Sequence, residues 1–225
     1  MSADLAPLWL TLRLAALVTA LLLVLATPLA WWLARSRSRI VPVVEAVTAL
    51  PLVLPPTVLG FYLLLAFNPG AALGAAWLSL SGTTLTFSFA GLVLASLIYS
   101  LPFTVQPLQA AFTLLGRAPM ETAASLGARP LDAFLTVALP LSLRGYLTAA
   151  VLTFAHTLGE FGVVLMVGGN IPGQTRVISI AIYEKVETLD YGGAHLLAGL
   201  LLALSFAILL ALYLLNAKDR RGGGR

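Results

Sequence analysis

The chain carries no charged side chain between Glu45 and Arg117, and most residues in that stretch are apolar. A water-soluble domain does not leave so long a segment without charge, because large exposed apolar surfaces are unfavourable in water. The whole chain agrees, since 60% of its 225 residues are hydrophobic, only 10% are charged and its mean hydropathy is +0.98. These features indicate that lipid surrounds the chain, which places it among the multispan membrane proteins.

A helix needs about 20 apolar residues to cross a hydrocarbon core about 30 Å thick. Turn-forming residues at 68–70 and 79–84 divide the uncharged stretch. We therefore predict an all-α polytopic membrane protein, with one transmembrane bundle over residues 8–216 and a short tail at 217–225. The five predicted spans cover residues 9–34, 47–67, 85–106, 139–161 and 194–216.

The distribution of Lys and Arg predicts the orientation, because these residues are enriched in cytoplasmic loops. With the N-terminus outside, only Arg13, Arg176 and Lys185 fall on the outer side, and the other basic residues fall on the cytoplasmic side. The charged loop 117–138 and the C-terminal tail are then cytoplasmic. Since basic residues gather at the ends of apolar runs, the net charge of +4 reflects orientation in the membrane, and we expect no nucleic-acid binding.

The residues present exclude several kinds of site. The chain has no Cys, so it has neither a disulfide framework nor a thiolate metal site, and His156 and His195 are too far apart to form a local ligand pair. A P-loop needs a Lys directly after a Gly, but neither Lys185 nor Lys218 follows one. We expect no catalytic residue, no metal site and no cofactor on this chain, so ATP and Mg²⁺ would have to be bound by a partner subunit.

The most informative polar segment lies at residues 117–129, between two predicted spans. Pro119 suits the first turn of a helix, where its missing N–H group costs little. Glu121 in the same turn is favoured by the positive end of the helix dipole. Gly127 can end this helix in a left-handed conformation, and Pro130 can begin a second short helix. The segment is thus predicted to form a small helical knob on the cytoplasmic side of the bundle.

The order of residues in the knob resembles the EAA loop of ABC importer permeases. That pattern is Glu-Ala-Ala, three residues, Gly, nine residues, Ile, one residue and Leu-Pro, and the chain matches this spacing from Glu121 to Pro140. The two departures are Thr122 for Ala and Val137 for Ile. The resemblance implies that the knob docks into a groove on an ATPase subunit and transmits its closure to the spans. The implied coupling residues are Glu121, Thr122, Ala123, Ala124, Ser125, Leu126, Gly127, Arg129, Leu139 and Pro140.

The chain is also similar to molybdate permeases over nearly its whole length, with matching segments at 50–60, 158–162, 170–176 and 180–183. This resemblance implies a type I ABC importer bundle that moves molybdate by alternating access and lies as a multi-pass protein in the lipid of a bacterial cytoplasmic (inner) membrane. The implied partners are a second copy in a homodimer, two cytoplasmic ATPase subunits and a periplasmic or extracellular oxyanion-binding protein. Tungstate and sulfate/thiosulfate permeases are closely related, and they remain alternatives.

Two features point to a pathway through the bundle. Prolines interrupt the second predicted span, so it must kink or unwind, either as an ordinary bend or as a pliable helix that lines a pathway. Glu160 is the one carboxylate well inside an apolar context, and we expect it to have a structural role near an outer gate. His156, one turn earlier, is either its partner or a satisfied interior histidine. The residues assigned to the pathway or gate are Pro55, Pro56, Thr57, Thr153, His156, Glu160 and Gly162.

Residues 162–193 contain a Gly- and Pro-rich stretch. We predict that they form an outer loop with a short helix or strand at the membrane surface. Asn170, Pro172 and Arg176 in this segment are the candidate residues for contact with the binding protein.

Two other classes of function fit a polytopic helical protein. A secondary transporter would need coupling carboxylates near the membrane midplane and usually inverted repeats, whereas this chain offers Glu160 and no evident repeat. An intramembrane hydrolase would need a buried Ser and His within hydrogen-bonding reach, and neither histidine lies on an evident partner helix. Transport without an ATPase subunit would favour the first class, and labelling by a serine-directed probe would favour the second.

Overall fold

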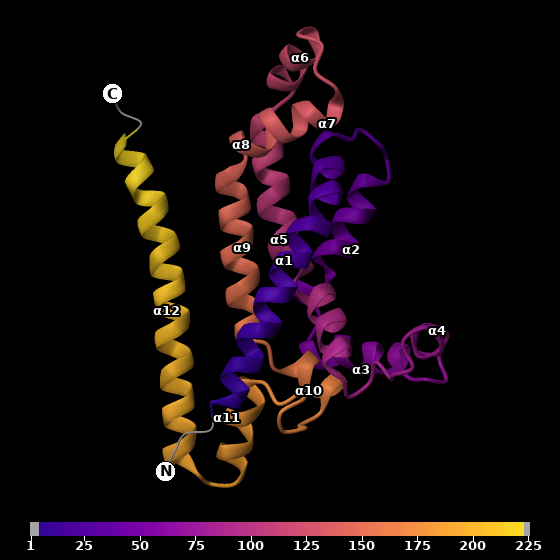
Figure 1. The fold of residues 1–225 in the computed structure, drawn as a ribbon, viewed down its shortest axis with the longest axis vertical. Coiled ribbons are helices and arrows are strands. Elements are labelled where there is room, and N and C mark those ends of the chain that lie inside the picture. Colours follow the sequence, from indigo (N-terminus) through magenta and orange to yellow (C-terminus); the bar gives the residue numbers. More distant parts are fainter. Residues whose placement is uncertain (1–4, 223–225) are drawn as a thin grey trace.

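The computed structural model describes residues 5–222, with side chains described as far as 211 and at 213 and 214. These residues form helices and no strand, which confirms the all-α prediction. Long helices stand side by side, and most of the short ones lie at two opposite ends of the bundle (Figure 1). In chain order the elements are α1 (Ala6–Arg35), α2 (Val41–Val53), α3 (Pro56–Phe67), α4 (Ala72–Ser81), α5 (Phe89–Leu115), α6 (Ala118–Ser125), α7 (Pro130–Ala133), the π-helix η1 (Phe134–Ala138), α8 (Leu139–Leu141), α9 (Leu143–Leu158), α10 (Gly162–Gly168), α11 (Ile178–Glu187) and α12 (Tyr191–Gly222).

Among the described residues, three helices are long and apolar enough to cross a membrane by themselves, namely α1, α5 and the Tyr191–Ala211 part of α12. Two further helix pairs pass the same test only as bent spans. α2 and α3 meet at 111°, and the segment Pro130–Leu141 meets α9 at 71°. The described residues therefore offer three candidate spans, or up to five if each bent pair crosses the membrane as one, and the predicted count of five stays a prediction.

α1 lies at the centre of the bundle, where it packs against both α5 and α9. Buried residues recur at every fourth position along it, at Leu14, Val18, Leu22, Ala26 and Ala30. This spacing places side chains on one face of a helix. Other large apolar residues of α1 are exposed, as expected for a helix that meets protein on one side and lipid on the other.

The second predicted span is broken at Pro55 rather than bent along its length. Pro51 stays buried inside α2, which ends at Val53, and α3 begins at Pro56. Pro55 has no N–H group to continue a helix, and Leu54 takes the extended conformation that residues before proline prefer. The expected unwinding is therefore found, and it separates two short helices that differ in direction by 111°.

The prediction that residues 162–193 lie at the membrane surface is wrong for their first part. α10 packs against both α3 and α5, and Val163, Val164 and Val167 are fully buried. An apolar helix without a polar face is more stable inside the bundle than in water, so the chain folds back inward after α9. The loop at 169–177 and α11 follow at the end of the bundle opposite α6 and α7 (Figure 1).

Candidate functional site

The knob predicted for residues 117–129 is present as α6, at one end of the bundle (Figure 1). Pro119 and Glu121 both stand in its first turn. Gly127 has a φ of 85°, and the N–H groups of Gly127 and Ala128 each donate to a carbonyl of the last turn at 3.0 Å. This is the Schellman arrangement that ends a helix at glycine. The local structure of the knob follows from its sequence.

Nearly all candidate coupling residues of the knob are exposed. Ala123 is the exception, because it is buried against the chain itself. Leu126 is 83% exposed, and a Cβ added at Gly127 would meet no atom within 4 Å. This face of the knob is therefore open to contact with another protein. The exposed coupling residues are Glu121, Thr122, Ala124, Ser125, Leu126, Gly127 and Arg129.

The knob joins the bundle through the π-helix η1, which the sequence did not reveal. η1 contacts α6, α7 and α8, and α8 contains the pattern residues Leu139 and Pro140. The ring of Phe134 in η1 lies edge-on to Trp31 of α1 with centroids 5.1 Å apart, and Trp31 contacts Phe112 of α5 at 5.0 Å. Edge-on packing is a favourable arrangement of aromatic rings. The knob is thus linked directly to two core helices.

At the opposite end of the bundle, two helix breaks lie against each other. A Cβ added at Gly162, the first residue of α10, would be 2.8 Å from the Cβ of Pro56, the first residue of α3. Further along the same pair, a Cβ at Gly60 would be 2.8 Å from the Cβ of Met166. Helices approach this closely only where glycine leaves room. Pro55, Pro56 and Thr57 are exposed beside this junction. Broken helices that meet inside a bundle are a common setting of transport sites.

Glu160 lies in the break between α9 and α10 and is 4% exposed. Its carboxylate oxygen Oε2 accepts a hydrogen bond from Ser96 of α5 at 2.7 Å. Its backbone carbonyl accepts one from Ser179 of α11 at 2.6 Å. Within the described part of the chain, Oε1 has no partner. The carboxylate does hydrogen-bond across helices, but its partner is Ser96 and not His156.

His156 contacts α5 instead of Glu160. Its Nδ1 lies 3.0 Å from the hydroxyl of Ser100, and its ring stacks on Phe103 with centroids 3.9 Å apart. A hydrolase would use such a Ser–His pair, so the expectation that no serine meets a histidine is wrong. Ser100 is fully buried and also bonds Thr157, which fits a packing role. Among residues 5–222, no three His, Cys, Asp or Glu side chains are grouped to hold a metal ion.

Buried hydroxyls form a ladder between α5 and α9. Ser96, Ser100 and Thr104 recur at every fourth position of α5, so they share one face of that helix. At the far end of the ladder the hydroxyls of Thr104 and Thr153 are 2.6 Å apart, and both residues are fully buried. In this conformation Thr153 therefore lies in the contact between two helices and lines no open path. Its assignment to the pathway stays a prediction.

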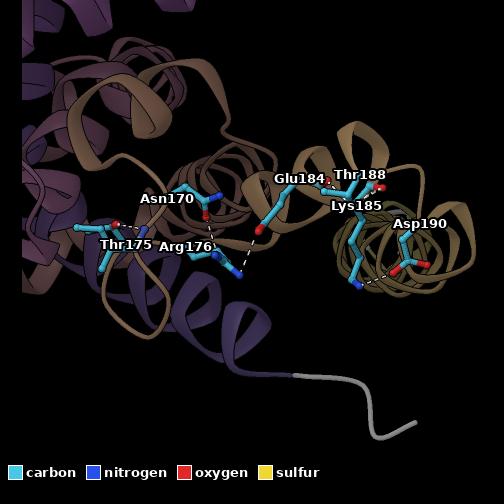
Figure 2. Close-up of polar contacts among 8 residues, drawn as sticks. Asn170, Thr175, Arg176, Glu184, Lys185, Thr188 and Asp190 are labelled. Atoms are coloured by element: carbon cyan, nitrogen blue, oxygen red, sulfur yellow. Dashed lines mark hydrogen bonds and ion pairs between the residues drawn. The ribbon is translucent and has the colours of Figure 1, made fainter.

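The candidate binding-protein contacts lie in the loop between α10 and α11. Figure 2 shows the guanidinium of Arg176 between Asn170 and Glu184. Its Nε donates to Oδ1 of Asn170 at 2.6 Å, and the ion pair with Glu184 has a length of 3.1 Å. Asn170 and Arg176 thus tie the loop to α11. Asn170 and Pro172 are both exposed and open to a partner, whereas Arg176 is half-buried.

A second polar contact, missed by sequence reasoning, closes the turn from α11 to α12 (Figure 2). Nζ of Lys185 donates to Asp190 at 2.7 Å, and the N–H group of Gly193 donates to the other carboxylate oxygen at 3.0 Å. These hydrogen bonds, first the one from Lys185, hold the pKa of Asp190 below its ordinary value. A spacing of five residues across a turn follows no helical or strand period, so the sequence alone gave no signal of it.

Comparison with known proteins supports one family. Residues 26–221 match the family described as "Binding-protein-dependent transport system inner membrane component". The chain is 57% identical over 210 residues to the Molybdenum transport system permease protein ModB of Azotobacter vinelandii, covering 93% of each chain. It is 40% identical over 201 residues to the protein of the same name from Mycobacterium tuberculosis, covering 89% of this chain and 75% of the relative. It is 34% identical over 193 residues to the Probable sulfate transport system permease protein cysT of Nephroselmis olivacea, covering 86% of this chain and 68% of the relative.

Proposed function

The chain belongs to the family of binding-protein-dependent transport system inner membrane components, and we propose that it is the membrane-spanning subunit of an importer that carries molybdate across a bacterial cytoplasmic membrane. The observation that supports molybdate as the substrate is the 57% identity to a molybdenum permease over 93% of both chains. The sulfate permease relative is only 34% identical. Tungstate, sulfate and thiosulfate are therefore the alternative substrates within the same family.

In this proposal two cytoplasmic ATPase subunits bind ATP and Mg²⁺ and supply the energy. The support is α6, an exposed helix at one end of the bundle that is closed at its C-terminus by the turn at Gly127 and carries the coupling pattern. Its contact with α1 and α5 runs through Phe134, Trp31 and Phe112. When the ATPases close on the knob, this aromatic cluster moves the core helices with it, because packed side chains transmit displacement rather than absorb it.

The bundle then opens alternately at its two ends. Figure 1 shows α6 at one end of the bundle and α11 at the other. In this proposal the α6 end faces the cytosol, and the end that holds α10 and α11 faces the binding protein. Two copies of the chain in lipid enclose the pathway, and the junction of the α2–α3 and α9–α10 breaks closes it at the outer end. The close glycine contacts at that junction support this assignment, since they let α3 and α10 pack tightly and move as one unit.

Transport by the reconstituted complex of this chain, its ATPase and its binding protein tests the proposal. We expect uptake of radiolabelled molybdate that requires ATP hydrolysis and is suppressed by excess unlabelled molybdate far more than by excess sulfate. Uptake that persists with a hydrolysis-dead ATPase would favour a secondary transporter. Equal suppression by sulfate would move the chain to the sulfate class, and direct binding of tungstate and molybdate to the binding protein would separate those two anions.

A further inference from the structure

Glu160 connects three elements at the gate end of the bundle. Along the chain it follows the end of α9 and precedes the start of α10. Its side chain accepts a hydrogen bond from Ser96 of α5, and its backbone carbonyl accepts one from Ser179 of α11. The break in which it lies contacts the α2–α3 break through Gly162 and Pro56. Any movement that separates α10 from α5 must therefore change the surroundings of Glu160.

The burial of Glu160 is not explained by the stability of the fold. A carboxyl group is costly inside a membrane bundle, and such residues usually have a functional role. One of its oxygens has no partner within the described part of the chain, and an unpartnered buried polar atom lowers stability further. An apolar residue in the same place would avoid both costs. A carboxyl group held by a single side-chain hydrogen bond instead suits a contact that has to open and close.

Ser179 makes this contact sensitive to the outer face of the bundle. It lies on α11, and the loop just before α11 is tied to that helix by Arg176, Asn170 and Glu184 (Figure 2). A partner that shifts the loop therefore also shifts α11. Because Ser179 donates to the carbonyl of Glu160, such a shift pulls directly on the break between α9 and α10.

We propose that Glu160 is the latch of the outer gate: its carboxyl group holds the α9–α10 break against α5 while the gate is closed, and displacement of α11 releases it. This inference rests on the proposed importer function and assigns a positioning role within it. Ser96 of α5 is the hydrogen-bond partner that holds this carboxyl group. Ser179 links the break to α11, at the face where the binding protein docks. When the latch opens, α10 and α3 leave α5 together, because their glycine contacts keep them in register.

The chain has no Cys, so one introduced thiol can report on the gate. Ala95 of α5 is fully buried in a cluster with Val163 and Val167 of α10 and with Leu63 of α3. In the assembled importer in proteoliposomes, Ala95→Cys should react slowly with a membrane-impermeant maleimide added from outside. Adding Glu160→Ala, Ser96→Ala or Ser179→Ala should raise the labelling rate on the order of tenfold, the effect expected from losing one buried hydrogen bond.

Two variants serve as matched controls. Thr104→Val breaks a buried hydrogen bond between α5 and α9. This hydrogen bond lies two helical turns along α5 from Ser96, away from Glu160. Thr104→Val should leave the labelling rate of Ala95→Cys unchanged. Glu160→Gln keeps an oxygen that accepts from Ser96, so it should label more slowly than Glu160→Ala. The latch would be overturned if Ser96→Ala and Ser179→Ala were labelled at the wild-type rate. It would also be overturned if Thr104→Val accelerated labelling as much as they do.

The same reporter separates this inference from the proposed function. In the wild-type background, binding protein plus an ATPase trapped in its closed state should increase labelling of Ala95→Cys. If this increase occurs but the latch variants behave like wild type, the importer stands and the latch does not. If neither the trapped ATPase nor the binding protein changes the labelling and no ATP-dependent uptake is found, the importer itself is contradicted.

Discussion

Glycine serves two different purposes in this chain, and the structure separates them. Gly127 and Gly173 have positive φ angles of 85° and 74°, and an added Cβ at either would meet no atom within 4 Å. Backbone conformation alone requires glycine there. Gly60 and Gly162 have ordinary φ angles, but an added Cβ would be 2.8 Å from a neighbouring side chain. At these positions the reason for glycine is packing, which the sequence by itself does not reveal.

Replacing Gly127 with Leu tests the knob at the residue scale. A side chain in the left-handed conformation costs about 1–2 kcal/mol, so the end of α6 should rearrange while the bundle, which has no contact there, stays intact. We expect co-purification of the ATPase to fall at least severalfold, with normal membrane insertion. Gly173→Leu imposes the same strain at the other end of the molecule and should keep the ATPase. Equal loss in both variants would contradict docking at the knob.

The contact between Lys185 and Asp190 predicts a pH dependence. The folded pKa of Asp190 lies below its ordinary value, because Lys185 and the N–H group of Gly193 bind the charged form. The contact is therefore stabilising above the unfolded pKa, and its contribution is lost as the pH falls through the folded pKa. The Tm of Asp190→Asn should lie slightly below that of wild type at neutral pH, and the gap should close as the pH falls below about 4. A gap that widens on acidification would show that the contact acts differently.

At the scale of elements, the breaks between helices show best what could and could not be predicted from the sequence. The prolines predicted an interruption of the second span, and the structure places it at Pro55 with a bend of 111°. The predicted end of the fourth span at 161 falls in the break between α9 and α10, but the return of the chain into the bundle as α10 was not predicted. α4 was missed as well, since it lies just after the first turn-forming cluster and its last residues, 79–81, fall inside the predicted second cluster. Both errors have the same cause, because hydropathy shows which residues avoid water but not the direction in which the chain runs.

The packing of the two broken spans can be tested at Gly60. An added methyl group would clash with Met166, so Gly60→Ala should destabilise the contact between α3 and α10 by about 1–3 kcal/mol. Gly199→Ala is the control, because that glycine also lies in an apolar helix but a Cβ there would meet nothing within 4 Å. Thermal unfolding in detergent should show a lower Tm for Gly60→Ala only. An unchanged Tm for both variants would mean that α10 does not pack as described.

At the scale of the whole molecule, the two ends of the bundle have different designs. One end carries the exposed knob and its aromatic link to α1 and α5, and the other carries the junction of two broken helices beneath the loop at 169–177 (Figure 1). α1 and α5 run between these ends and pack against each other along the way. A displacement applied to the knob therefore has a continuous packed route to the gate, as alternating access requires.

This arrangement predicts that the two ends lie on opposite sides of the membrane. Ser125 and Pro172 are both exposed. The chain has no Cys, so a Cys introduced at either position is the single thiol of that variant. An impermeant maleimide should label Pro172→Cys in right-side-out vesicles and Ser125→Cys only in inside-out vesicles. Labelling of both from one side would contradict the orientation, and the reverse pattern would place the knob outside the cell.

The sequence by itself determined that lipid surrounds this protein, that its fold is helical and that residues 117–129 form a small helical knob. These depend on local chemistry: long uncharged apolar runs partition into lipid, and Pro119, Glu121 and Gly127 begin and end a helix wherever it lies. Only the tertiary structure decided that Glu160 meets Ser96, that Trp31 meets Phe134 and that Gly162 meets Pro56. Each of these pairs joins residues far apart in the chain, and in a sequence that is apolar on every face no periodic pattern tells which side of a helix turns inward.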